Sequence, residues 1–275
     1  MRLLLPVADN ADHNNADHNN ADLDNANPEQ GVDPHAHYAA GWLAEGGVRV
    51  NFVSSVDGAA TAAGLSRGLQ TPGDNVVFAA LRDLADVILV GASTAAAEGY
   101  RPSQPATRRR AIRLANGLAE APAIAVMSSS LDLDLSAPLY SAATQAPTLI
   151  VTGSSAPVAR RNDIIDLAGG DSKLQLLQTD SDGNGGVDFA AAVASLRELG
   201  YRRILCEGGP RLFGAGVAAG AVDELCLTYS PLLAGPAGPR IVVGEPWPDG
   251  SVVALSLIGL LAEDGALFCR YRIQR

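Results

Sequence analysis

Residues 203–214 read Arg-Ile-Leu-Cys-Glu-Gly-Gly-Pro-Arg-Leu-Phe-Gly, and this stretch decides the fold. Its apolar start predicts a short buried strand that ends at Glu207. Gly208 and Gly209 then allow a sharp turn and the close approach of a ligand, because neither carries a Cβ atom. Pro210 suits the first turn of a helix. Together these features predict an anion-binding helix N-terminus, although an ordinary strand-to-helix turn would show the same pattern.

Strands and helices alternate on both sides of this stretch. The expected strands before it are 49–55, 86–91, 123–127, 148–151 and 174–177, and the expected helices are 72–84, 107–118, 156–167 and 188–199. After residue 219 only strands are expected, at 225–230, 241–243, 256–261 and 266–271. This order predicts one α/β domain whose central sheet is mixed, mostly parallel and flanked by helices, with antiparallel strands at the C-terminal end.

The N-terminal part differs in composition from the rest of the 275 residues. Residues 9–30 contain six acidic side chains and no Lys or Arg, and Ala-Asp-His-Asn-Asn occurs at 11–15 and again at 16–20. A polar repeat of this kind cannot form a core, so we expect disorder there. The sequence thus predicts an N-terminal extension at 1–41 and one domain at 42–275.

Composition excludes several classes of protein. There is no broad basic field for nucleic acid, and the longest apolar run, 252–261, is about half a membrane span. The three cysteines lie in apolar runs, which favours reduced core residues of a cytoplasmic protein without a metal site. All four histidines precede residue 38, which argues against a Ser-His-Asp hydrolase.

Small or acidic residues follow three predicted strands, at Asp57-Gly58, Gly91–Thr94 and Glu207–Gly209. Because the carboxyl ends of parallel strands share one edge of a sheet, these residues should meet there. Two glycine turns at one edge suit a dinucleotide, although neither is the G-x-G-x-x-G fingerprint. Asp57 and Glu207 would be the two carboxylates that face the site. Asp57 fits a simple turn former equally well, since Asp-Gly is a common turn pair.

Three ordered motifs carry a resemblance to a known family. They are Val-Ser-Ser-Val-Asp-Gly at 53–58, the Gly91-x-x-Thr94 turn, and Glu-Gly-Gly-Pro-x-Leu at 207–212. From residue 48 to its end the chain resembles the 5-amino-6-(5-phosphoribosylamino)uracil reductases of the riboflavin pathway, which have a dihydrofolate reductase-like fold. The resemblance implies an NADPH-dependent, usually homodimeric reductase that converts a ribosylamine into a ribitylamine by hydride transfer.

The resemblance also implies site residues by position. The catalytic candidates are Asp57 and Glu207, and the substrate-binding candidates are Asn51, Ser66, Arg82 and Glu207. The cofactor-binding candidates are Val53, Asp57, Gly91, Thr94, Glu98, Gly208, Gly209, Leu212, Phe213 and Gly214. A helix face with Arg108, Arg109, Arg110 and Arg113 could hold the 2′-phosphate of NADPH, or could simply be solvated.

The chain also departs from the family pattern. It has no cysteine before Cys206, so these residues hold no zinc deaminase domain. Glu98 replaces the family's Asp, and Gly68 stands where a bulky aromatic is common, which would widen the substrate pocket. The expected substrate is therefore a pyrimidine or a pterin, with a non-catalytic NADPH-binding regulator as the alternative from another class. The apolar late strands, 241–271, predict a homodimer because exposed sheet edges are usually covered.

Overall fold

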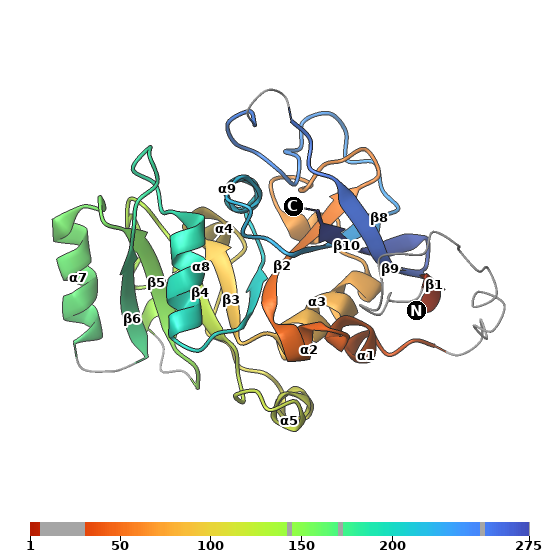
Figure 1. Cartoon of the computed structure of the whole chain (residues 1–275), viewed down its shortest axis with the longest axis horizontal. Coiled ribbons are helices and arrows are strands. Elements are labelled where there is room, and N and C mark those ends of the chain that lie inside the picture. Colours follow the sequence, from red (N-terminus) through yellow and green to blue (C-terminus); the bar gives the residue numbers. More distant parts are fainter. Residues whose placement is uncertain (6–30, 142–144, 170–172, 248–250, 275) are drawn as a thin grey trace.

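The computed structural model describes residues 1–5, 31–141, 145–169, 173–247 and 251–274. These residues form one ten-stranded sheet in the order β1-β9-β10-β8-β2-β7-β3-β4-β5-β6 (Figure 1). The strands from β8 to β6 pair in parallel, whereas β10, β9 and β1 add antiparallel pairs. The predicted mixed, mostly parallel sheet with an antiparallel C-terminal part is confirmed.

The strands are β1 (Arg2–Leu5), β2 (Gly47–Ser55), β3 (Val87–Gly91), β4 (Ala123–Met127), β5 (Thr148–Gly153), β6 (Leu174–Thr179), β7 (Arg203–Cys206), β8 (Glu224–Ser230), β9 (Leu255–Glu263) and β10 (Ala266–Ile273). The helices are α1 (Pro34–Ala39), α2 (Trp42–Glu45), α3 (Pro72–Leu84), α4 (Ala92–Ala97), α5 (Thr107–Ala115), α6 (Pro138–Ser141), α7 (Val158–Ala168), α8 (Phe189–Glu198) and α9 (Pro210–Ala218), with a short 3₁₀ turn, η2 (Ser66–Gly68).

Both faces of the sheet are covered by helices (Figure 1). The apolar face of α8 and Phe213 of α9 pack on one face, against side chains such as Val50 and Leu89. On the other face, α1, α2 and α3 pack with Leu205 and Phe268. Because successive side chains of a strand point to opposite faces, the central strands are apolar almost throughout.

Strand β7 lies between β2 and β3, and this placement positions the site. Cys206 pairs with Val50 of β2 and with Leu89 of β3. The chain therefore makes its sharp turn at Gly208 and Gly209 beside the carboxyl end of β3 and the second half of β2. In an open α/β sheet, this edge is where ligands bind.

Residues before Trp42 also pack on this unit. Within the expected extension, β1 pairs with β9, placing Leu3 opposite Leu261, and Tyr38 of α1 is only 1% exposed. These parts therefore belong to the sheet and its core, so the boundary expected at residue 42 does not follow the packing. The repeat tract, 9–30, lies outside the described residues.

Buried arginines fasten α1 to the sheet. Arg49 donates a hydrogen bond to the carbonyl of Tyr38, and Arg270 donates one to the carbonyl of His37. Both guanidinium groups contact one carboxylate oxygen of Glu224, at 2.7 and 3.0 Å. Burial, followed by the two guanidinium charges, lowers the pKa of His37 to about 4. The histidine is therefore neutral at pH 7 and adds no charge to this cluster.

The predicted strand at 241–243 is wrong. This segment lies outside the sheet, and Val243 donates a backbone hydrogen bond of 3.2 Å to Pro210 at the start of α9. Ile241 and Val242 are apolar because they pack against the core under α8 and α9. The other edge of β9 is paired with β1, so the apolar residues of the late strands lie on a face of the sheet rather than on an open edge.

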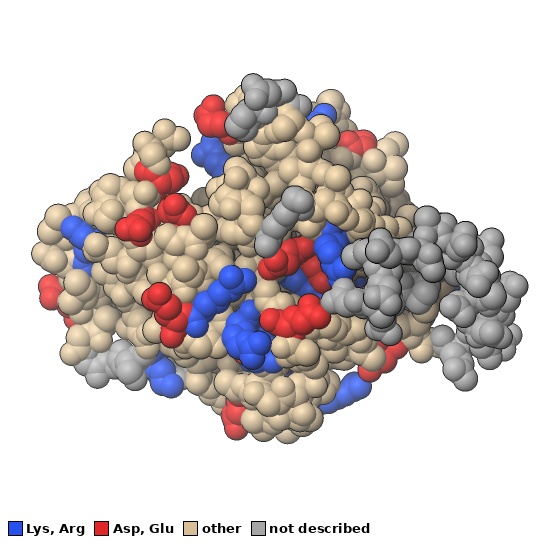
Figure 2. Space-filling view, in the orientation of Figure 1, with Lys and Arg blue, Asp and Glu red and all other residues tan. Residues whose placement is uncertain are grey.

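The surface is mixed in charge. On the face shown in Figure 2, acidic and basic side chains of the described residues are interspersed, without a broad area of one sign. Cys206, Cys226 and Cys269 are all buried, as predicted for core residues, and none of them forms a disulfide within the described residues. Among the helices in the described part of the chain, none combines the length and apolarity needed to cross a membrane.

Candidate functional site

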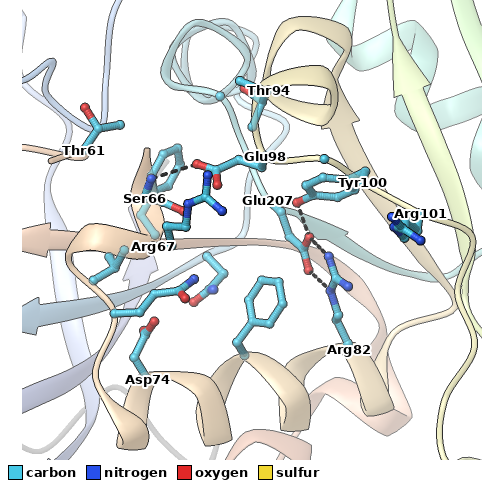
Figure 3. Close-up of a pocket in the computed structure, with 18 of the residues that line it drawn as sticks. Thr61, Ser66, Arg67, Asp74, Arg82, Thr94, Glu98, Tyr100, Arg101 and Glu207 are labelled. Atoms are coloured by element: carbon cyan, nitrogen blue, oxygen red, sulfur yellow. Dashed lines mark hydrogen bonds and ion pairs between the residues drawn. The ribbon is translucent and has the colours of Figure 1, made fainter. Parts of the chain in front are cut away.

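A cavity of about 610 Å³ opens beside the turn after β7. It lies between α3, the loop around η2, the start of α4 and the carboxyl ends of β2 and β7 (Figure 3). Its lining includes Val53, Ser66, Arg82, Thr94 and Glu207, which come from five separate parts of the sequence. The fold thus gathers all four predicted substrate contacts, Asn51, Ser66, Arg82 and Glu207, and several of the predicted cofactor contacts at one place.

The two glycine turns predicted from the sequence meet at this cavity. The backbone N–H of Gly91 donates a hydrogen bond of 2.8 Å to the carbonyl of Gly208, and the peptide bond between Gly208 and Gly209 is cis. A Cβ atom on Gly209 would stand 2.5 Å from Oγ1 of Thr94. The left-handed conformation belongs to Gly208, at φ +87°, where a Cβ atom would also meet the ring of Phe52 at 2.8 Å. Neither position has room for a side chain.

Helix α9 begins directly after this turn, with Gly209 as its N-cap and Pro210 in its first turn. No side chain caps this end of the helix. The backbone N–H groups of the first turn and the positive end of the helix dipole therefore face the region of Thr94 and Gly209, an arrangement that suits a phosphate group. The bare glycine backbone beside it fits the pyrophosphate of a dinucleotide cofactor.

Glu207 is held by two neighbours from the opposite wall. Arg82 donates from Nε to Oε1 at 2.7 Å and from Nη2 to Oε2 at 2.6 Å, and the hydroxyl of Tyr100 donates to Oε2 at 2.5 Å (Figure 3). The guanidinium also lies over the rings of Phe78 and Tyr100, with centroids at 4.2 and 5.3 Å. The side chain of Glu207 is 2% exposed. These contacts fix the orientation of Arg82 at the cavity wall, and a catalytic role of Glu207 stays a prediction.

Asp57, the other predicted carboxylate, is not in the cavity lining. Its Oδ1 accepts hydrogen bonds from Ser55 Oγ and from the backbone N–H of Ala234, and its Oδ2 accepts one from Gly235. The bond from Ser55, followed by that from Ala234, lowers the pKa of Asp57 to about 2. The structure therefore places Asp57 where the turn-forming alternative requires it, tying the end of β2 to a neighbouring loop.

The predicted cofactor contacts separate into two groups. Thr94 and Glu98 line the cavity, and Glu98 accepts a hydrogen bond of 2.8 Å from the N–H of Ser66. Phe213 does not line it, because the residue is 3% exposed and its ring packs on that of Phe52. Leu212 also packs against that core, and a Cβ on Gly214 would lie 2.7 Å from the carbonyl of Val243. The side chains of Leu212 and Phe213 and the small size of Gly214 therefore serve the packing of α9, and contact of these three residues with a cofactor stays a prediction.

Two further expectations change with the structure. Arg113, expected on an exposed helix face, is fully buried and donates to backbone carbonyls of Arg82, Asp83, Ala85 and Ala119. It therefore holds the end of α3 and is not available for a cofactor phosphate.

Gly68 does not line the cavity, and a Cβ atom there would meet Ala62 at 2.9 Å. The small residue permits close packing of the loop and does not widen the pocket.

Asp74 is a lining residue that sequence reasoning missed. It lies in the first turn of α3, is 4% exposed, and its Oδ1 has no hydrogen-bond partner among the described residues. Burial raises its pKa to about 6, against a hydrogen bond with Thr228 that acts in the other direction. The sequence marked Asp74 only as part of a helix start, where acidic residues are common because they interact with the helix dipole.

Comparison with known proteins agrees with this geometry. The model of the RibD C-terminal domain family matches residues 47–262. A 2,5-diamino-6-ribosylamino-4(3H)-pyrimidinone 5′-phosphate reductase from Archaeoglobus fulgidus is 26% identical over 166 residues, which are 60% of this chain and 71% of that protein.

Solved structures show the same fold. A pyrimidine reductase-like protein from Corynebacterium diphtheriae superposes with a TM-score of 0.72 at 24% identity, covering 89% of this chain and 100% of the other. The riboflavin biosynthesis reductase Rib7 of Saccharomyces cerevisiae gives 0.59 at 14% identity, with 84% and 90% covered. Acinetobacter baumannii RibD gives 0.60 at 16% identity, with 84% of this chain but only 59% of RibD covered. The resemblance in the sequence motifs is thus confirmed, and the chain belongs to the RibD C-terminal domain family of riboflavin-pathway pyrimidine reductases.

Proposed function

We propose that this chain is an NADPH-dependent reductase of the riboflavin biosynthesis type. Its substrate would be a 6-(5-phosphoribosylamino)pyrimidine, either the 5-amino-uracil form expected from the sequence or the 2,5-diamino form in the name of the Archaeoglobus protein. The product would carry a ribitylamino chain. The observation that carries this proposal is the contact between the Gly91 and Gly208 turns at the mouth of a cavity that also holds Ser66 and Arg82.

The parts of the cavity suit the parts of such a reaction. A bound NADPH would supply the hydride at its nicotinamide ring. Gly91, Thr94, Gly208 and Gly209 would hold the cofactor, with the N-terminus of α9 beside its phosphates. Arg82, fixed by Glu207, would face the substrate phosphate with Ser66, because a guanidinium held in one orientation loses little conformational entropy on binding. The protein's contribution is alignment of the two ligands.

The test is NADPH oxidation by the purified chain with each of the two phosphoribosylaminopyrimidines, followed by absorbance. We expect turnover with one of them and identification of the ribitylamino product by mass spectrometry. Binding of NADPH without oxidation in the presence of either pyrimidine or of a dihydropterin would support the non-catalytic regulator instead. Absence of NADPH binding would refute the proposal.

We also propose that the chain forms a homodimer through the outer face of β9 and β10. Leu257 lies opposite Tyr271 and Leu267 lies opposite Ala262, so these side chains share one face of the sheet. Leu255, Leu257 and Leu267 are 44%, 39% and 38% exposed. A patch of large apolar side chains on a strand pair is typical of a protein–protein contact. Light scattering at micromolar concentration should give the mass of two chains, and a monomer would contradict this.

A further inference from the structure

Asp74 and Asn51 line the cavity, and each has a buried acceptor atom that no group in the described residues satisfies. Oδ1 of Asp74 and Oδ1 of Asn51 both lack hydrogen-bond partners, although the two residues are only 4% and 9% exposed. A buried polar atom without a partner costs free energy, and native proteins retain few of them. Both residues line the cavity, so N–H donors on a bound ligand would supply the missing partners.

The position of Asp74 fixes where those donors would lie. In Figure 3 the carboxylate of Asp74 points from the first turn of α3 into one end of the cavity, while Arg82 and Arg101 lie toward the other end. Asp74 and Arg82 are eight residues apart on the same helix, which separates them by about 12 Å along its axis. Thr94 and Glu98 lie above the space between them (Figure 3).

This polarity matches a heterocycle at one end and an anionic group at the other. A ring bound at Asp74 would direct its ribosyl chain toward Arg82 and Arg101, which suit a phosphate. The carbon that receives the hydride lies between ring and phosphate in such a substrate, and Thr94 and Glu98, the expected cofactor contacts, overlie the corresponding space. The cavity therefore has a carboxylate on α3 at one end and Arg82 with Arg101 at the other, while Arg67 lines the side nearer Asp74 (Figure 3).

Resting on the function proposed above, we propose that Asp74 selects the 2-amino-4-oxopyrimidine edge of the substrate, formed by ring N3–H and the exocyclic 2-amino group. A carboxylate can accept from both of these parallel donors. A 2-oxo ring would set a carbonyl oxygen against the carboxylate at the same place and leave an acceptor unpaired, which costs much more than a missing contact. The side chain of Thr228 holds the carboxylate from the sheet side.

The 2-amino-4-oxopyrimidine edge occurs both in the diaminopyrimidinone phosphate and in pterins. Activity with each compound shows which of these two substrate classes the cavity accepts. Steady-state NADPH oxidation is measured with 2,5-diamino-6-(5-phosphoribosylamino)pyrimidin-4(3H)-one, with its uracil counterpart and with 7,8-dihydrofolate. We expect kcat/KM for the diaminopyrimidinone to exceed that for the uracil by about 100-fold or more. Higher kcat/KM with dihydrofolate than with the diaminopyrimidinone would identify a pterin as the source of the edge.

The Asp74→Asn variant tests the role of this carboxylate in substrate preference directly. An amide has one acceptor and one donor, which complement the N3–H and the carbonyl oxygen of a uracil edge. The variant should lose about 100-fold in kcat/KM with the diaminopyrimidinone and lose little or gain with the uracil, so the preference collapses or reverses. Asp166→Asn on α7, an exposed carboxylate at the far end of the molecule, is the matched control and should leave both values unchanged (Figure 1).

Ring binding is measured separately by calorimetry, with 2,5,6-triaminopyrimidin-4-one and 5,6-diaminouracil as probes that cannot be reduced by this reaction. A preference for the triamino ring that disappears in Asp74→Asn, without turnover of any substrate, would reject the proposed reductase and keep this inference. Equal use of the uracil phosphate by the natural chain, or an equal loss with both rings in Asp74→Asn, would overturn the inference and leave the reductase in place.

Discussion

Arg82 and Glu207 join two walls of the cavity through two parallel hydrogen bonds of 2.7 and 2.6 Å. The residues lie on α3 and directly after β7, 125 positions apart in the sequence. A bidentate pair of this kind fixes a guanidinium in one orientation and one plane. The carboxylate expected to act on the substrate is thus placed to act through the arginine.

That relationship predicts strong coupling between the two residues. Arg82→Gln and Glu207→Gln should each lower kcat/KM by about 10- to 100-fold, and the double variant should be no worse than either, because each change removes the same oriented pair. A double-mutant cycle on urea unfolding should give a coupling free energy on the order of 2 kcal/mol. Additive losses of activity would instead mean that Glu207 contacts the substrate independently.

Gly209→Val should abolish tight NADPH binding. The new Cβ atom would stand 2.5 Å from Oγ1 of Thr94, so either the turn or the predicted cofactor contact must move. We expect the Kd for NADPH, measured by fluorescence titration, to rise at least about 100-fold, which corresponds to roughly 3 kcal/mol. Gly183→Val, at a glycine with open space around it, is the control. Unchanged affinity in Gly209→Val would exclude this turn from the cofactor site.

Asp74→Asn should stabilise the ligand-free protein, and the gain should depend on pH. The pKa of Asp74 rises from 3.8 to about 6 on folding, so the native state loses stability as pH rises from about 4 to about 6, and the loss is complete once the carboxylate is ionised in both states. The variant lacks this loss, and its advantage should grow from nearly zero at pH 4 to on the order of 3 kcal/mol at pH 8.

Urea unfolding of both forms across this pH range measures the effect. Asp166→Asn should show no such trend, because that side chain is exposed. A ligand-free Asp74→Asn protein that is less stable than the natural chain at pH 8 would mean that the carboxylate has a structural role.

Arg113→Met should reduce stability without changing cofactor preference. The buried guanidinium donates to several backbone carbonyls around the end of α3, and its loss leaves these acceptors unsatisfied. We expect a loss of at least about 3 kcal/mol in unfolding free energy. The ratio of Kd values for NADH and NADPH should stay as in the natural chain, where we expect NADPH to bind more tightly. A change in this ratio of Kd values would mean that Arg113 contributes to cofactor binding.

Local patterns predicted the parts of the fold that depend on local chemistry. The strand and helix around Gly208 and Gly209 follow from an apolar run, two glycines and a proline. The helix expected at 188–199 forms as α8, capped by Asp188 through a 2.9 Å hydrogen bond from Ala191. Strand β1 was not predicted, because its four residues owe their conformation to β9, more than 250 positions away. The strand predicted at 241–243 is wrong because an apolar run can be buried against helices as well as within a sheet.

The sequence also could not show which carboxylates face the candidate site. Asp57 follows a strand and precedes a glycine, yet its oxygens are taken by Ser55 and by loop N–H groups. Asp74 looked like an ordinary acidic residue in a first helical turn. Only the packing of α3 over the sheet shows that it is buried and lacks a partner. Burial and the use of lone pairs are tertiary properties, so sequence spacing cannot rank these two residues.

The insertion of β7 between β2 and β3 has a consequence for the time at which this protein becomes able to bind its ligands. During synthesis, β2 and β3 emerge more than 100 residues before β7, and neither has its central neighbour until the chain passes Cys206. The Gly208 turn and the start of α9 arrive only after that. The proposed cofactor, NADPH, would therefore stabilise a growing chain only after most of it has left the ribosome, and would act on the last stage of folding and not on the first.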